Sequence, residues 1–313
     1  MGLTGVAERA ETARGLAAAP ARPRGRSWLR ANASLLLVLP TLGLLIAFLL
    51  LPYLNMVVMS MRTPSTRQVF APGFTAANYL DALLDPDFFY LRILWDTMAL
   101  GVMTTAICLL LGYPVAYHLA RSRSRFKGIL YACILSPLLV GVVVRCYGWI
   151  IILANNDGLI NNTLRRLGLI ETYLPLMYNT FGVSVGLVHI FLPFMILPVL
   201  GAISSIDPAL EEAAQSLGAS RLRTMQRVVF PLSLPGVQAG TVLVFVLTIS
   251  SYVIPILLGG FKVVIMSTLV VQQLLDAMLW PFGAALAFLL SISGGLVVYL
   301  YLKGTSRFMR GIA

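Results

Sequence analysis

The sequence predicts an all-α membrane protein with six transmembrane helices and both termini in the cytoplasm. Hydrophobic residues make up 58% of the 313 residues and charged residues only 11%, whereas soluble domains carry about 25% charged residues. Six apolar stretches are long enough to cross a bilayer as helices. Basic residues gather in alternate connections between these stretches. Together these observations indicate an integral, multi-pass membrane protein in contact with lipid.

Each of the apolar stretches approaches or exceeds the roughly 20 residues that a spanning helix requires. Prolines fall within or near their ends, and spanning helices tolerate them when neighbouring groups bind the freed carbonyls. The predicted spans are Ser34–Met59, Leu91–Ala120, Ile129–Leu153, Gly182–Ile203, Gly236–Leu258 and Gly283–Leu302.

The distribution of basic residues predicts the orientation. Six arginines lie within residues 1–31, an extension rich in Ala, Arg, Gly and Pro that we expect to be disordered. Further basic residues lie in the second and fourth connections and at the C-terminus, while the other connections hold fewer for their length. Since connections rich in Lys and Arg stay in the cytoplasm, both termini are predicted there, with residues 306–313 as a cytoplasmic tail.

The segment Glu211–Gly236 carries two acids and three arginines in this apolar chain. Each charge would cost about 2.5 to 3.5 kcal/mol near the bilayer centre, so the segment lies outside the hydrocarbon. Asp207 can cap a first short helix, and Gly218 can end it. Ser220 can cap a second, which Pro231 is predicted to stop. Such a helix–turn–helix either meets a partner beneath the bilayer or is simply an amphipathic loop in water.

The second short helix is predicted to have two distinct faces. Arg223 and Arg227, four residues apart, share one of them. The other is apolar and can lie against the underside of the membrane. Its members are Leu222, Met225 and Val229.

Specific residues in this segment resemble the EAA loop of ABC-importer permease subunits. They are Glu212-Ala213-Ala214, Gly218, Val228 and Phe230-Pro231, where Val and Phe replace an aliphatic residue, usually Ile, and Leu. In that family the loop forms the coupling helix, which docks in a groove of the ATP-binding subunit. The resemblance therefore implies a coupling loop over residues 205–235. Its candidate docking residues are Glu211, Glu212, Ala213, Ala214, Gly218, Arg221, Arg223 and Pro231.

Three further stretches are similar to the spermidine/putrescine-type permease subfamily. They read GYPVAYHLAR (Gly112–Arg121), SPLLVGVVVRCYGWIIILANNDGLIN (Ser136–Asn161) and LWPFGAAL (Leu279–Leu286). The usual Arg-Thr-Tyr-Ala-Trp of that subfamily is here Arg-Cys-Tyr-Gly-Trp, from Arg145 to Trp149.

The resemblance implies a type I ABC-importer permease fold over residues 32–305, in the bacterial inner (plasma) membrane. It also implies three kinds of protein partner: two ATP-binding cassette subunits, a second permease subunit and an extracytoplasmic solute-binding protein. The transported solute is implied to be a polyamine or a similar small organic molecule. Two departures weaken the polyamine inference, because many relatives carry an acid and a threonine where this chain has Ser251 and Ile254.

Charged and aromatic residues near the predicted outer side are candidates for the solute path. Asp96 and Arg145 are predicted to fall at similar depth in the outer half of adjacent antiparallel spans. They either pair or reach the interface separately. Four aromatic residues either hold amine cations over their rings or form an interfacial belt. These are Tyr147, Trp149, Tyr252 and Trp280.

Two glycine pairs, Gly182 with Gly186 and Gly236 with Gly240, place small residues on one face of the fourth and fifth predicted spans. Small residues at this spacing let helices approach closely. The close contact is expected either between spans of this chain or with a second copy.

Several other function classes find no support in the sequence. No glycine-rich phosphate-binding loop precedes a lysine, so this chain is not expected to hydrolyse ATP, and no nucleophile–base pair suggests another enzyme. His118 and His189 have no Glu or Cys at metal spacing, so neither a metal nor a cofactor is expected. The basic residues lie in short connections, which does not indicate nucleic-acid binding. The remaining alternative, a stand-alone channel or secondary transporter, would need polar residues deep in several spans.

Overall fold

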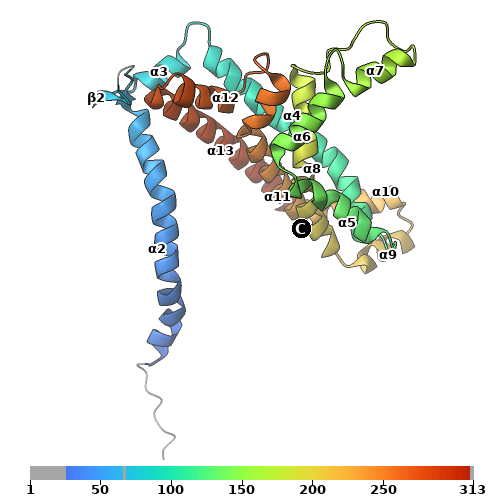
Figure 1. The fold of residues 1–313 in the computed structure, drawn as a ribbon. Coiled ribbons are helices and arrows are strands. Elements are labelled where there is room, and N and C mark those ends of the chain that lie inside the picture. Colours follow the sequence, from blue (N-terminus) through green and yellow to red (C-terminus); the bar gives the residue numbers. More distant parts are fainter. Residues whose placement is uncertain (1–25, 66–67, 311–313) are drawn as a thin grey trace, which may run out of the picture. The chain divides into compact units, whose positions relative to one another are not determined.

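The computed structural model describes residues 26–65 and 68–310 and is helical apart from one short sheet (Figure 1). The chain divides into an N-terminal unit, Met1–Asn55, and a larger unit, Met56–Ala313. The described part of the N-terminal unit belongs to helix α2 (Arg26–Ser60), which begins inside the segment 1–31 that was expected to be disordered. Residues 1–25 and 311–313 lie outside the described residues.

The larger unit contains the remaining spans and their connections. Strands β1 (Arg62–Thr63) and β2 (Ala71–Phe74) pair antiparallel after α2. The helical elements that follow are α3 (Ala77–Leu83), α4 (Phe89–Arg121), α5 (Lys127–Leu135), η1 (Ser136–Leu139), α6 (Val142–Leu153), α7 (Leu159–Arg166), α8 (Thr180–Ser204), α9 (Pro208–Ser216), α10 (Arg221–Thr224), η2 (Met225–Val229), α11 (Phe230–Ile249), η3 (Pro255–Gly259), α12 (Met266–Val271), η4 (Gln272–Asp276) and α13 (Trp280–Arg310).

Five described helices are long and apolar enough to span a membrane, and the number is six if a bent helix pair forms one span. This confirms the predicted helical membrane fold, with one correction to its geometry. The third span was predicted as a single helix over Ile129–Leu153. The structure has two helical pieces there, Lys127–Leu139 and Val142–Leu153, and the chain bends by 103° between them. Val140 and Gly141 between them are extended. Pro137 precedes the bend in η1, and its missing N–H weakens the helix there.

The core of the larger unit lies where α4, α8 and α11 pack against one another. The glycines predicted to allow close packing do so within the chain. A Cβ at Gly240 of α11 would lie 2.8 Å from Met195 Sδ of α8, and one at Gly236 would lie 2.5 Å from the Pro198 carbonyl oxygen. Because nothing larger than hydrogen fits at these positions, the two helices approach closely there.

The fifth span begins earlier than the predicted Gly236 and ends earlier than Leu258. Its helix runs from Arg221 to Ile249, so the prediction that Pro231 stops a separate short helix is wrong. A π-helical turn, η2, precedes the proline, and the Phe230 N–H donates to the carbonyl oxygen of Met225. This wider turn locally changes the hydrogen-bond ladder, so the helix continues past a residue that lacks an N–H.

The three residues of the predicted apolar face have different surroundings, because the second short helix continues into α11. Val229 is fully buried in the core, Met225 packs against the core, and Leu222 remains exposed. Only Leu222 is therefore available to lie beside the membrane, because the other two side chains belong to the helix bundle.

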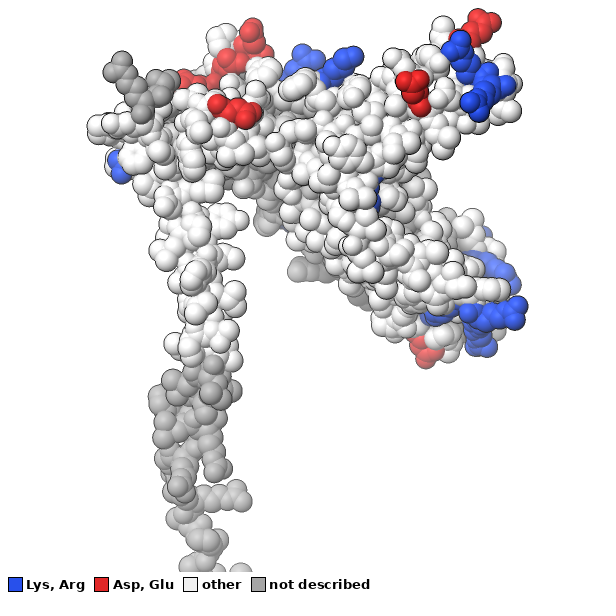
Figure 2. Space-filling model, viewed as in Figure 1, with Lys and Arg blue, Asp and Glu red and all other residues white. Residues whose placement is uncertain are grey.

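Helices α9 and α10 lie at one end of the bundle, and α3, α7 and α12 lie at the opposite end (Figure 1). Lys and Arg side chains gather at the α9–α10 end (Figure 2). This is the end that the positive-inside rule predicts to face the cytoplasm. At the C-terminus, α13 continues through Arg310 and so includes much of the predicted tail over 306–313.

Candidate functional site

The segment that joins α8 to α11 is held in shape by the capping residues identified in the sequence. Asp207 caps α9, accepting a hydrogen bond from the Ala209 N–H at 2.9 Å, and Pro208 follows it. Gly218 ends the turn with φ of +86°. Ser220 caps α10 by accepting from the Arg223 N–H at 3.4 Å. These contacts confirm the predicted helix–turn–helix, and they leave most of its outward surface available.

The outward surface of this segment combines small, apolar and basic side chains. Glu212 and Ala213 are exposed, and Leu217 is 90% exposed. A hollow of about 290 Å³ lies beside Leu217 and Gly218, with Arg223 and Arg227 both in its wall. The two arginines thus share one face, as their spacing predicts. We refer to Glu212, Ala213, Ala214, Leu217, Gly218, Arg223 and Arg227 as the docking surface.

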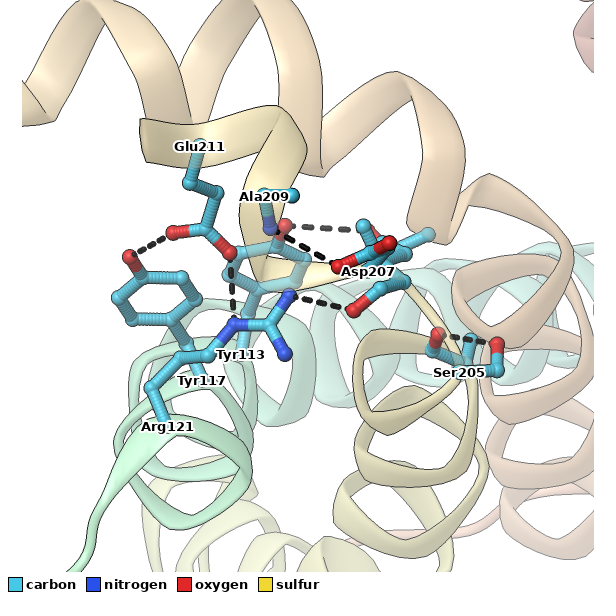
Figure 3. Close-up of polar contacts among 10 residues, drawn as sticks. Tyr113, Tyr117, Arg121, Ser205, Asp207, Ala209 and Glu211 are labelled. Atoms are coloured by element: carbon cyan, nitrogen blue, oxygen red, sulfur yellow. Dashed lines mark hydrogen bonds and ion pairs between the residues drawn. The ribbon is translucent and has the colours of Figure 1, made fainter. Parts of the chain in front are cut away.

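Glu211 is the buried residue of α9, and its side chain points toward Tyr117 and Arg121 of α4 (Figure 3). Its carboxylate is buried and forms an ion pair with Arg121, where Nε lies 2.6 Å from Oε1. The Tyr117 hydroxyl donates to Oε2 at 2.8 Å, and Arg121 Nη2 donates to the Ile206 carbonyl oxygen at 3.1 Å. Glu211 was expected at the docking interface, but its charged group is directed toward span α4.

Arg121 and Tyr117 were not among the candidate site residues from the sequence. Their four-residue spacing places them on one face of a helix and was visible in the stretch GYPVAYHLAR. Their partner lies 90 and 94 residues away in the chain, respectively. Helix periodicity therefore indicates the pairing face but not the residue that binds there.

The other two coupling candidates differ in position. Arg221 is exposed at the first residue of α10. Pro231 is partly buried at the start of α11, where it follows the π-helical turn. Pro231 shapes the helix that leaves the segment, and its side chain is not part of the docking surface.

Of the two alternatives for Asp96 and Arg145, the ion pair does not form among the described residues. Asp96 is exposed and lines a hollow of about 470 Å³ together with Thr180 and Lys262. Arg145 Nε and Nη1 are covered and have no hydrogen-bond partner among the described residues. The depth comparison assumed a straight third span, whereas the 103° bend before Val142 changes where Arg145 lies. Arg121–Glu211 is the one ion pair within the parts of the chain whose side chains are described.

The four aromatic candidates do not gather into one cluster. Trp149 of α6 donates from Nε1 to Nδ1 of His189 in α8 at 3.1 Å. Tyr147 is exposed on α6, Tyr252 lies between α11 and η3, and Trp280 begins α13. Within the described residues no ring contact joins any two of the four. Their predicted role in the solute path remains a prediction.

Comparison with known proteins identifies related chains over most of this length. Residues 108–311 match the family model described as binding-protein-dependent transport system inner membrane component. The spermidine/putrescine transport system permease protein PotB of Escherichia coli (strain K12) is 34% identical over 269 residues, covering 86% of this chain and 96% of that protein. A probable molybdenum ABC transporter permease protein of Haloferax volcanii is 26% identical over 212 residues, covering 67% of this chain and 74% of that protein.

The fold also matches a solved structure. A chain in the crystal structure of a bacterial alginate ABC transporter, in complex with an alginate pentasaccharide-bound periplasmic protein, has a TM-score of 0.65 to this chain at 19% identity. The match covers 91% of this chain and 98% of that one. At this identity the likeness concerns the fold.

Proposed function

Because the chain belongs to the family of inner membrane components of binding-protein-dependent transport systems, we propose that it is one of two permease subunits in an ABC importer for a polyamine or a similar small organic solute. It is a multi-pass inner membrane protein of that family. In the proposed assembly it lines part of the solute path and docks an ATP-binding cassette subunit. A second permease, a second cassette subunit and an extracytoplasmic solute-binding protein complete the assembly.

The docking surface carries this proposal. It stands at one end of the bundle on two short helices, outside the core formed by α4, α8 and α11. The small side chains of Ala213 and Ala214 permit a partner to approach the backbone of α9 closely, and exposed Leu217 offers apolar area for burial.

Charge on the docking surface indicates the chemistry of the partner. Arg223 and Arg227 line the same hollow, and no ion pair with either is formed within the described residues. Two guanidinium groups in one wall favour a carboxylate on the partner. Exposed Glu212 on α9 adds a charge of opposite sign to the same surface. Complementary charges of both signs fix the register of docking more than they add affinity.

In the proposed transport cycle, the ATP-binding subunits act on the permease through the docking surface. When the two cassettes bind ATP and close, they move the segment that joins α8 to α11 in each permease, which we call the docking segment. The segment continues into α11 without a break in the helix, so its movement reaches the core directly. The pore between the two permeases then changes from an inward-facing to an outward-facing state. ATP is hydrolysed by the cassette subunits.

The cargo assignment rests on the relatives, because PotB is the permease of a spermidine/putrescine transport system. One feature of this chain fits a cationic solute: Asp96 is the one acid within the described spanning helices. Tyr147, Trp149, Tyr252 and Trp280 can hold amines over their rings and are proposed to contribute. Arg145 opposes a polycation nearby, so it is proposed to orient or exclude solute.

Co-purification and ATP hydrolysis test the importer assignment. Ala213→Arg adds bulk where close approach is needed, and Glu212→Lys reverses an exposed charge. Both variants should reach the membrane at normal levels but retain little ATP-binding subunit and little solute-stimulated ATP hydrolysis. Arg166→Gln, at the far end of α7, is the control and should behave as the unmodified chain. If both docking variants assemble and transport normally, the importer assignment is wrong and a stand-alone transporter becomes the better hypothesis.

A further inference from the structure

One face of α4 carries polar side chains at three successive turns. Tyr113 forms a hydrogen bond with the Ser233 hydroxyl of α11 at 3.0 Å. Tyr117 and Arg121 each bind a different oxygen of Glu211 in α9. The four-residue spacing aligns all three on the helix. This face of α4 is therefore bonded both to α9 and to the helix into which the docking segment continues.

The contact with Glu211 is built to resist displacement. Both carboxylate oxygens are bound, and the relative exposure of the two ionised side chains is only 19% for Arg121 and 9% for Glu211. Arg121 also binds the Ile206 carbonyl oxygen, directly before the Asp207 cap. Charge-assisted hydrogen bonds are stronger than neutral ones, and losing one partner of a buried pair leaves an uncompensated charge. Moving α9 away from α4 would break several such contacts together.

The rest of α9 makes little use of the bundle. Glu211 is its one buried residue, and the helix packs chiefly on α10 and η2, which belong to the same segment. Its neighbours Leu210 and Glu212 are exposed. The side-chain link from α9 itself to span α4 therefore runs through the Glu211 carboxylate, next to the bond between Arg121 and the Ile206 carbonyl oxygen.

We propose that Tyr117, Arg121 and Glu211 form a clamp that transmits movement of the docked segment to α4. This inference rests on the proposed function, because a clamp has a task only if α9 is moved by a partner. Glu211 is then a positioning residue, and Glu212 beside it serves docking. In this arrangement the segment acts on two spans: on α11 through the continuous helix and on α4 through the clamp.

The test uses the complete importer, reconstituted with its ATP-binding subunits and binding protein. Glu211→Gln keeps the side-chain volume, whereas Arg121→Gln shortens the side chain, and each removes one charge. Both should retain the ATP-binding subunit, while solute transported per ATP hydrolysed should fall by about two- to thirtyfold. Arg123→Gln removes an exposed arginine two residues further on and is the matched control, with an unchanged ratio. The double Gln variant should be no worse than either single one, because the contact is already broken.

The ratio of transport to hydrolysis separates the clamp from a purely structural contact. If Glu211→Gln only destabilises the chain, both rates fall with the amount of intact protein and the ratio stays normal, which overturns the proposal. If instead the ATP-binding subunit is lost as completely as in Glu212→Lys, Glu211 belongs to docking and the proposal is also wrong.

A milder variant and the docking control complete the test. Where Glu211→Gln does not accumulate, Tyr117→Phe removes a single hydrogen bond and should lower the ratio by a smaller factor; an unchanged ratio then contradicts the clamp. If Glu212→Lys assembles and transports normally, docking itself is refuted and the proposed function fails. If only the Glu211 and Arg121 variants contradict expectation, the clamp fails alone.

Discussion

Substituting Gly218 by valine isolates the backbone geometry of the docking surface. Gly218 has φ of +86°, and a Cβ built there meets nothing within 4 Å. The substitution therefore creates no steric clash with the rest of the chain, and its cost comes from the left-handed backbone alone. That cost is about 1 to 2 kcal/mol for a residue with a Cβ. A tenfold change in affinity corresponds to about 1.4 kcal/mol.

If the turn between α9 and α10 must keep this geometry in the docked state, the strain lowers the binding free energy of the ATP-binding subunit. The ATP-binding subunit should then bind the Gly218→Val permease about five- to thirtyfold more weakly. Binding is measured by titrating the purified ATP-binding subunit onto permease pairs reconstituted in lipid nanodiscs. The amount of variant in the membrane should remain normal, because the spans do not depend on this turn.

Gly201→Val is the matched control for this measurement. Gly201 is exposed in α8, a Cβ there also meets nothing within 4 Å, and its backbone is helical. Valine is no less favourable than glycine inside a helix, so the affinity should be unchanged. Equal affinity of Gly218→Val and Gly201→Val would show that the left-handed turn is not needed for docking, and the docking surface would have to be reassigned.

Two further predictions concern the core and the solute path. Gly240→Val should destabilise the purified chain by about 1 to 3 kcal/mol, because its Cβ would lie 2.8 Å from Met195 Sδ and 3.2 Å from the Met195 carbonyl oxygen; a thermal-unfolding midpoint equal to that of Gly201→Val would contradict this. Asp96→Asn should raise the KM for uptake of a cationic solute about two- to fivefold at low salt, with a smaller effect at high salt because exposed charges are screened. An unchanged KM at low salt would remove Asp96 from the solute path.

The spans were predictable because their apolar length leaves few alternatives to a membrane helix, but proline effects were not. Pro114 in α4 and Pro193 in α8 lie inside unbroken helices. Pro137 precedes a bend of 103°, and Pro231 follows a π-helical turn. The outcome depends on whether neighbouring elements bind the freed carbonyl and fill the space beside the ring. A single sequence does not contain that tertiary information.

The docking segment shows the same division between local and distant determinants. Asp207, Gly218 and Ser220 act on residues two or three positions away, and each was placed correctly from the sequence. The ion pair of Arg121 with Glu211 joins two helices that are adjacent only in the folded chain. Its charges were visible in the sequence, but their pairing was not.

The adjacent glutamates of α9, Glu211 and Glu212, have different surroundings. Successive residues on an α-helix are rotated by about 100°, so Glu211 and Glu212 point in clearly different directions. In α9, Glu211 is buried and directed toward the bundle, whereas Glu212 is exposed. A buried carboxylate needs a compensating cation, and Arg121 in the last turn of α4 supplies it. We therefore expect the two acids of α9 to have separate tasks, Glu212 in binding the partner and Glu211 in holding the helix to α4.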